Sequence, residues 1–154
     1  MIKGKCGCGA VSYRMTTPPM FVHCCHCTDC QRQTGAAYVL NAIIEADRVT
    51  VEGPVAEHAL PTPSGKGQII TRCQNCGVAV FSSYMVRHGK LRYVRVGTLD
   101  DPNQCRPDAQ IFTRSKQAWV PLSEDIPSFE AFYNFDEVWP QGSLDRLQAA
   151  LTAR

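Results

Sequence analysis

The sequence predicts a mainly β domain of antiparallel strands with one helix near its C-terminal end. Short runs of β-branched and aromatic residues recur along the chain, and several of them alternate with polar neighbours. Turn-forming residues separate these runs, which is typical of short strands joined by tight connections. The chain has 154 residues, the length of one domain, and we expect residues 1–154 to form a single unit.

The expected strands and turns follow one another in a simple order. The strand-like runs cover residues 11–13, 38–44, 48–51, 68–71, 78–81, 91–96 and 111–112. Breakers lie between them at Pro18-Pro19, Gly53-Pro54, 61–67, His88-Gly89 and 101–103. We expect residues 121–142, which are rich in acidic and aromatic side chains, to wrap over the sheet.

The C-terminal segment predicts a helix over about residues 143–153. Ser143 is a candidate N-cap, and Asp145 carries a negative charge that favours a helix start. Three leucines repeat at helical spacing and would share one apolar face: Leu144, Leu147 and Leu151.

Charge and hydropathy exclude two classes of partner. The net charge is +2, and the Lys and Arg residues are scattered, so we expect no nucleic-acid partner. No apolar run is long enough to cross a membrane. The first five residues lead directly to Cys6 without the apolar stretch of a secretory signal, so we expect a cytoplasmic protein with no membrane partner.

Cysteine spacing indicates metal sites rather than disulfides. The chain has nine cysteines, an odd number, and seven of them fall into short C-x-C and C-x-x-C patterns. These clusters are Cys6-Gly7-Cys8, Cys25-His26-Cys27-Thr28-Asp29-Cys30 and Cys73-Gln74-Asn75-Cys76. Clustered thiols suit a tetrahedral zinc ion.

The number of ligands separates two kinds of zinc site. Two pairs, Cys6 with Cys8 and Cys73 with Cys76, can close a four-sulfur structural site. The middle cluster supplies three sulfurs, Cys25, Cys27 and Cys30, and leaves one coordination position free. We therefore expect two zinc ions per chain, the second in an open and catalytic site. Cys6 and Cys8 are expected to project from one strand, and Asp29 is a candidate cap for the turn at Cys30.

The remaining cysteines and histidines are expected to lie outside the metal sites. By strand alternation, Cys24 and His26 should point away from Cys25 and Cys27, which leaves Cys24 as a buried small residue. Cys105 stands alone in a polar loop. The other histidines lack metal-ligand spacing and are expected to be surface or hydrogen-bonded groups: His23, His58 and His88.

The ordered set of motifs resembles the glutathione-dependent formaldehyde-activating enzyme (GFA) family, which includes centromere protein V-like proteins. The likeness covers about residues 4–130. The matching segments are Gly4-Lys5-Cys6-Gly7-Cys8-Gly9-Ala10-Val11, Cys25 to Gly35, Arg72-Cys73-Gln74-Asn75-Cys76-Gly77, Gly97 to Pro102, Ile111 to Ser115 and Trp119-Val120.

The resemblance implies a fold and an activity. The fold would be a β-tent of small antiparallel sheets. The resemblance assigns Cys6, Cys8, Cys73 and Cys76 to a structural zinc, and Cys25, Cys27 and Cys30 to a catalytic zinc. One departure is Gln110, which stands where family members often carry His and cannot act as an acid or base.

The function implied is a carbon–sulfur lyase type of reaction. A thiol such as glutathione would bind the open zinc, lose its proton and add to a small aldehyde such as formaldehyde, giving a hemithioacetal, or the reverse. Lewis-acid polarisation of the carbonyl is an alternative role for zinc. Two other functions stay open, a non-catalytic zinc module that binds partners and a redox or zinc sensor using Cys24 and Cys25. The oligomeric state is not predicted.

Overall fold

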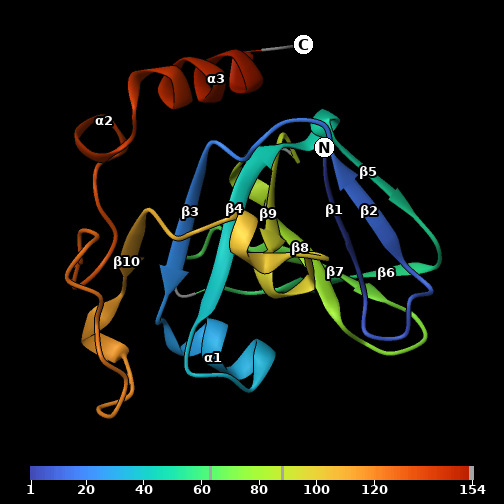
Figure 1. The fold of residues 1–154 in the computed structure, drawn as a ribbon, viewed down its shortest axis with the longest axis horizontal. Coiled ribbons are helices and arrows are strands. Elements are labelled where there is room, and N and C mark those ends of the chain that lie inside the picture. Colours follow the sequence, from blue (N-terminus) through green and yellow to red (C-terminus); the bar gives the residue numbers. More distant parts are fainter. Residues whose placement is uncertain (63, 88, 153–154) are drawn as a thin grey trace.

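The chain folds into two β-sheets, as seen in the computed structural model, which describes residues 1–62, 64–87 and 89–152 (Figure 1). The small sheet has the order β1-β2-β5 and the large one β10-β3-β4-β9-β8-β7-β6. The strands of the small sheet are β1 (Ile2–Lys5), β2 (Ser12–Met15) and β5 (Val49–Glu52). Those of the large sheet are β3 (Phe21–Cys25), β4 (Val39–Glu45), β6 (Val55–Leu60), β7 (Gln68–Cys73), β8 (Ala79–Tyr84), β9 (Leu91–Arg95) and β10 (Ala109–Ile111).

The predicted mainly β fold is confirmed, with one parallel pair that the sequence pattern did not indicate. β10 runs parallel to β3, and the other strand pairs of both sheets are antiparallel. The chain reaches β10 only after the other strands are complete, so its register with β3 depends on contacts distant in sequence. β6 was also not predicted, because its outer half is exposed and its apolar pattern is weak.

Two apolar cores lie on opposite faces of the large sheet. β4 is buried along most of its length, so its alternate side chains enter different cores. Ala42 and Ile44 join the core shared with the small sheet, and Ile43 joins the core beneath the C-terminal segment. The C-terminal core also contains Phe21, whose ring stacks on that of Trp139 with centroids 5.0 Å apart.

Three helices and several 3-10 turns connect and cover the strands in the described chain. The helices are α1 (Thr28–Thr34), α2 (Phe135–Val138) and α3 (Gln141–Thr152). The 3-10 turns are Ala46–Arg48, Met85–Arg87, Val96–Thr98, Pro102–Gln104 and Thr113–Ser115. In Figure 1, α1 lies at one end of β3 and β4, and α3 crosses the opposite end. No helix in the described residues is long and apolar enough to cross a membrane.

The C-terminal helix is confirmed, but it begins earlier than expected. α3 starts at Gln141, and residue 153 of the expected range lies outside the described residues. Ser143 is therefore not the N-cap. Its backbone N–H donates to the carbonyl of Pro140, inside the first turn, and its hydroxyl donates to the Met20 carbonyl at 2.6 Å. The expected apolar face is present, since Leu147 is buried and Leu144 and Leu151 pack around it.

The segment before α3 covers the edge of the large sheet. Residues 127–131 run beside β10, where Gln110 donates its backbone N–H to the Pro127 carbonyl and accepts at its own carbonyl from Phe129. Farther along the chain, Tyr133 packs over the C-terminal core. The segment thus wraps the edge of the sheet and then one face.

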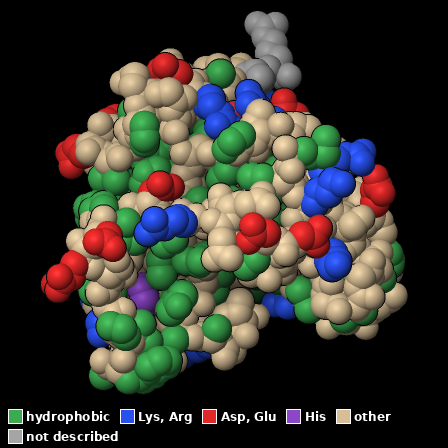
Figure 2. Space-filling view, in the orientation of Figure 1, with side chains coloured by type: hydrophobic (Ala, Val, Ile, Leu, Met, Phe, Trp, Pro, Cys, Tyr) green, Lys and Arg blue, Asp and Glu red, His purple; other side chains and the backbone are tan. Residues whose placement is uncertain are grey.

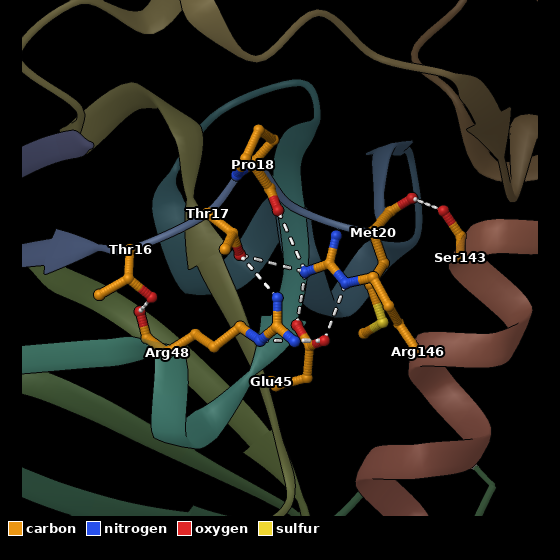
Figure 3. Close-up of polar contacts among 8 residues, drawn as sticks. All are labelled: Thr16, Thr17, Pro18, Met20, Glu45, Arg48, Ser143 and Arg146. Atoms are coloured by element: carbon orange, nitrogen blue, oxygen red, sulfur yellow. Dashed lines mark hydrogen bonds and ion pairs between the residues drawn. The ribbon is translucent and has the colours of Figure 1, made fainter.

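An ion cluster attaches α3 to the sheet (Figure 3). The Glu45 carboxylate, whose side chain is 6% exposed, accepts from the Arg146 guanidinium at 2.6 and 2.8 Å and faces Arg48 at 3.3 Å. Arg146 also donates to the Pro18 carbonyl and the Thr17 hydroxyl. Burial raises the pKa of Glu45, but the hydrogen bonds and charge of Arg146 outweigh it and lower the pKa overall.

Replacing Arg146 with Met should lower the free energy of unfolding by about 2–3 kcal/mol, because a buried carboxylate would lose its closest partner. The matched control is Arg14→Met, which removes the exposed Arg14–Glu52 pair and should cost about 0–1 kcal/mol. Urea unfolding at pH 7 measures both. Equal losses in the free energy of unfolding for the two variants would show that the buried cluster stabilises the protein no more than an exposed ion pair does.

The same cluster makes stability depend on pH. The pKa of Glu45 is lower in the folded protein than in the unfolded chain, where it is about 4.3. The stabilisation that Glu45 contributes to folding is therefore complete above about pH 4.3 and is lost as the pH falls through the folded pKa. The difference between the parent protein and Arg146→Met should therefore shrink between about pH 5 and pH 3.

Candidate metal centres

Four cysteine sulfurs from two distant turns meet between the sheets. The Sγ atoms of Cys6, Cys8, Cys73 and Cys76 lie within 4.8 Å of one another. Cys6 and Cys8 are 3.5 Å apart, and Cys8 and Cys73 are 3.8 Å apart. A tetrahedral ion with metal–sulfur bonds of about 2.3 Å holds its sulfurs about 3.8 Å apart, so this group can hold such an ion.

Local backbone geometry directs these sulfurs toward one another. Cys6 and Cys8 lie in the turn after β1 rather than in a strand, which corrects the expectation from alternation. The turn closes with a hydrogen bond from the Gly9 N–H to the Cys6 carbonyl, and Gly9 has a φ of 77°. The second turn is similar, because Gly77 has a φ of 73° and its N–H donates to the Cys73 carbonyl.

Three further sulfurs meet where β3 passes into α1. The Sγ atoms of Cys25, Cys27 and Cys30 lie within 4.8 Å of one another. Cys25 ends β3, and Cys27 is the N-cap of α1, where its sulfur accepts from the Cys30 N–H at 3.3 Å. Asp29 is therefore not the cap. It lies inside the first turn of α1, and Cys27 is the N-cap.

The electrostatics of this group favour negative charge on one sulfur. A hydrogen bond from Cys25, a second from Cys30 and backbone N–H groups lower the pKa of the Cys27 thiol strongly. The same contact raises the pKa of Cys25, whose thiol serves as the donor and is buried. Without a metal ion the three thiols thus resist losing all their protons together. A bound metal ion removes that resistance, because coordinated thiols are deprotonated.

No fourth Cys, His, Asp or Glu ligand joins these three sulfurs in the part of the chain that the structure describes. Cys24 and His26 lie together on the opposite side, with 3.5 Å between the Cys24 Sγ and the His26 Nε2. Both are buried, as expected for residues that alternate with Cys25 and Cys27. A tetrahedral ion held by these three sulfurs would keep one coordination position free of protein ligands.

The other candidates lie away from both groups. Cys105 is buried in the core between the sheets rather than exposed in its polar loop. His23 is buried and hydrogen-bonded to the Tyr133 hydroxyl, and burial lowers its pKa to about 3. His58 is exposed, and His88 lies outside the described residues.

Gln110 holds the C-terminal segment instead of facing the three sulfurs. Its amide donates to the Ser123 carbonyl at 2.9 Å and to the Ser128 hydroxyl at 2.7 Å, and its oxygen accepts from the Ser123 N–H. The strand register pairs it with Cys24, so its side chain lies on the face of the sheet away from Cys25. These hydrogen bonds explain why an amide fits this position.

A buried arginine beside the site was missed by sequence reasoning. Arg95 ends β9 with 5% of its surface exposed and donates to the side-chain oxygens of Asn41 and Gln33. Burial lowers the pKa of Arg95, and its interaction with the nearby Cys30 side chain opposes that shift. The sequence shows only that Arg95 ends a short strand, Leu91–Arg95, which also contains Arg92. It does not show which elements surround the Arg95 side chain.

A cleft of about 460 Å³ lies next to this network. Its walls come from the end of α1, the start of β4, the β7–β8 turn and the end of β9, including Gln33, Thr34, Tyr38, Arg72 and Arg95. Figure 2 shows a recess along the lower edge of the molecule, between the regions over α1 and over the β7–β8 turn, with a basic side chain visible inside it.

The chain is similar to a curated protein and to a solved structure. A Halomonas elongata protein, whose curated name assigns it provisionally to the glutathione-dependent formaldehyde-activating enzymes, is 37% identical over 60 residues. That match covers 38% of this chain and 37% of the relative's length. A solved Rhodobacter sphaeroides structure overlaps 82% of this chain and 98% of its own, with a TM-score of 0.49 and 16% identity.

The family profile extends much farther along the chain. The profile described as "Glutathione-dependent formaldehyde-activating enzyme" matches residues 1–115, a range that contains both cysteine groups, Arg72 and Arg95. The match covers well over half of the sequence. The chain belongs to the glutathione-dependent formaldehyde-activating enzyme family.

Proposed function

We propose that this protein is a zinc-dependent enzyme of the carbon–sulfur lyase type, which adds a glutathione-like thiol to a formaldehyde-like aldehyde or catalyses the reverse. Family membership supports this reaction class. The observation that carries the proposal is the three-sulfur group at Cys25, Cys27 and Cys30, which has no fourth protein ligand among the described residues. A group built only for stability normally closes with four ligands.

Both sulfur groups fit zinc. Sulfur-only ligand sets at tetrahedral spacing favour zinc over the harder divalent ions, which prefer oxygen. Cys6, Cys8, Cys73 and Cys76 would hold a structural ion, and the remaining three cysteines a catalytic one. When bound in the open group, zinc lowers the pKa of a coordinated thiol so that the thiolate forms near neutral pH.

The reaction balances without an oxidant or reductant. The substrate thiol loses its proton, and a sulfur electron pair forms a bond to the aldehyde carbon. The carbonyl π pair moves onto oxygen, which takes up a proton. The product is a hemithioacetal, and the reverse reaction breaks the same carbon–sulfur bond.

The residues of the chain contribute position and charge. The end of β3 and the first turn of α1 hold Cys25, Cys27 and Cys30 at fixed spacing. Arg95 places a buried positive charge near Cys30, which favours thiolates there. Gln110 lies on the other face, and its amide cannot act as an acid or a base, so proton transfer in this protein does not use that position. We assign this activity to one domain of residues 1–154, with a core over about 4–130.

The purified protein should contain two zinc ions per chain that differ in lability. The open group has one protein ligand fewer, so a mild chelator should remove its ion first. Elemental analysis and a timed chelator titration measure this. A content of one ion, or the loss of both ions in a single phase, would contradict the two-site assignment.

Serine substitutions should separate stability from activity. Cys6→Ser or Cys76→Ser should unfold the chain or lower its melting temperature sharply, because structural zinc contributes on the order of 10 kcal/mol to folding in small domains. Cys27→Ser should keep the fold and abolish hemithioacetal formation. Cys24→Ser is the matched control, because Cys24 lies outside both groups and both ions should remain. If Cys27→Ser unfolds the protein and Cys76→Ser does not, the two roles are reversed.

Direct coordination of the substrate thiol can be measured with cobalt in place of zinc. Thiolate-to-cobalt absorption should increase when glutathione is added, because a further sulfur enters the open position. S-methylglutathione, which has no thiol, should leave the spectrum unchanged. A spectrum that responds to neither compound would exclude this route and leave carbonyl polarisation as the role of the ion.

A further inference from the structure

Phe112 has an unusual backbone conformation. Its φ is 55° and its ψ is 38°, and among the described residues it is the one non-glycine residue with a positive φ. A bulky aromatic residue rarely adopts this conformation, and such strain persists only where the surroundings impose it, commonly at functional sites. Here the Phe112 N–H donates to the Ala131 carbonyl at 3.1 Å, and the Phe112 carbonyl accepts from the Ser115 hydroxyl at 3.0 Å. The same hydroxyl donates to the His26 carbonyl at 3.0 Å, which ties this turn to the end of β3.

The left-handed turn places the Phe112 ring on the face of the large sheet that carries Cys25. Ile111 ends β10 and is paired directly with Cys25, so these two side chains share a face. An extended chain would direct the next side chain, that of Phe112, to the opposite face. Instead, the Phe112 ring centroid lies 6.2 Å from that of Phe132, and the Phe132 ring meets the His23 ring edge-on at 5.5 Å. His23 alternates with its neighbours along β3 and shares the face of Cys25.

Phe112 and Phe132, which we call the aromatic wall, lie beside the three-sulfur group. Phe112 directly follows the residue paired with Cys25, and paired strands are about 4.8 Å apart. Phe132 packs on His23, which is two residues from Cys25, or about 6.6 Å along the strand. The aromatic wall therefore borders the side of the three-sulfur group that faces β10.

The aromatic wall is open to solvent. Phe132 has 45% of its surface exposed, and Phe112 is half-buried. Figure 2 shows hydrophobic side chains at the surface over the segment that follows β10, at the lower left of the molecule. A single exposed apolar residue is common. Here the exposed ring adjoins a strained aromatic residue and a group of candidate metal ligands, a combination that indicates an apolar binding surface.

We propose that the aromatic wall receives the substituent of the aldehyde, and that the preferred aldehyde therefore carries an aromatic group. Formaldehyde has only hydrogen on its carbonyl carbon and offers nothing to this surface. An aromatic substituent would remove apolar area from water and also gain the ring–ring contact that Phe112 and Phe132 make available. The inference rests on the proposed function and adds to it the group attached to the aldehyde carbon.

One half of the aromatic wall comes from outside the range of the family profile. The profile matches residues 1–115, which include Phe112 but not Phe132. Phe132 is held by ring contacts with Tyr133 at 4.9 Å and Phe135 at 5.5 Å, within the segment that wraps the sheet. The preference for an aromatic aldehyde would thus be a property of this chain, supplied by the segment that follows the profile.

Phenylacetaldehyde and acetaldehyde test the proposal because they differ by one phenyl group. With the zinc-loaded protein and glutathione, kcat/KM should be at least about tenfold higher for phenylacetaldehyde, after subtraction of the uncatalysed addition of each aldehyde. Equal values, or a preference for acetaldehyde, would overturn the proposal.

Substitutions locate the contact. Phe132→Ala should lower the ratio of kcat/KM for phenylacetaldehyde to that for acetaldehyde at least about fivefold, and Phe132→Leu should keep part of it because it retains apolar area. Phe112→Gly should lower the ratio similarly, since glycine accepts the left-handed backbone without strain. The matched control is Leu60→Ala, which removes an exposed apolar side chain at the other edge of the sheet and should not change the ratio. Zinc content and melting temperature confirm that the variants are intact. An unchanged ratio in Phe132→Ala would refute the assignment.

Binding without chemistry separates this proposal from the proposed function. 2-Phenylethanol is an unreactive mimic of phenylacetaldehyde. In protein with isotope-labelled phenylalanine, it should shift the nuclear magnetic resonance signal of the Phe132 ring, which is assigned by its loss in Phe132→Ala. Ethanol at the same concentration should not shift it. If the signal shifts while no aldehyde is converted, the aromatic wall stands and the proposed chemistry does not. If aldehydes are converted while the phenyl group affects neither the rate nor the signal, the chemistry stands and the role of the aromatic wall is wrong.

Discussion

The meeting of four sulfurs between the two sheets is the contact on which the rest of the structure depends. It joins the turn after β1 to the turn between β7 and β8. Cys8 and Cys73, which contact each other there, are 65 positions apart in the sequence. Each strand of the small sheet has four residues, too few to be stable without packing against another layer. The sulfur group and the core around Val11, Tyr13 and Val80 supply that layer.

The open sulfur group depends on a change from strand to helix over six residues. β3 is buried on both faces, so it offers Cys25 on one face and Cys24 on the other. α1 then begins at once and brings Cys27 and Cys30 back to the first face. Its other end contributes Gln33, which accepts from Arg95 and donates to Gln68 at 3.0 Å. One short helix thus positions two of the three sulfurs and part of the wall of the neighbouring cleft.

Cysteine spacing predicted the membership of both sulfur groups, because ligand number and short separations are local properties of the sequence. Strand alternation correctly placed Cys24 and His26 away from the open group. It failed for Cys6 and Cys8, where a glycine turn rather than a strand directs the sulfurs. Arg95, the cleft and the partners of Gln110 could not be predicted, because they depend on the pairing of β3 with β10 and of β4 with β9.

The unequal ends of the large sheet have a consequence for how chains of this fold associate. At one end the segment around Pro127 and Phe129 pairs with β10 and uses its backbone groups. At the other end β6 pairs with β7 alone among the described strands, and its residues from Glu57 to Leu60 are exposed. A free edge recruits strands from other polypeptides unless polar side chains discourage them. Aggregation through this sheet would therefore start at β6. The exposed polar side chains of Glu57 and His58 on this strand oppose such pairing.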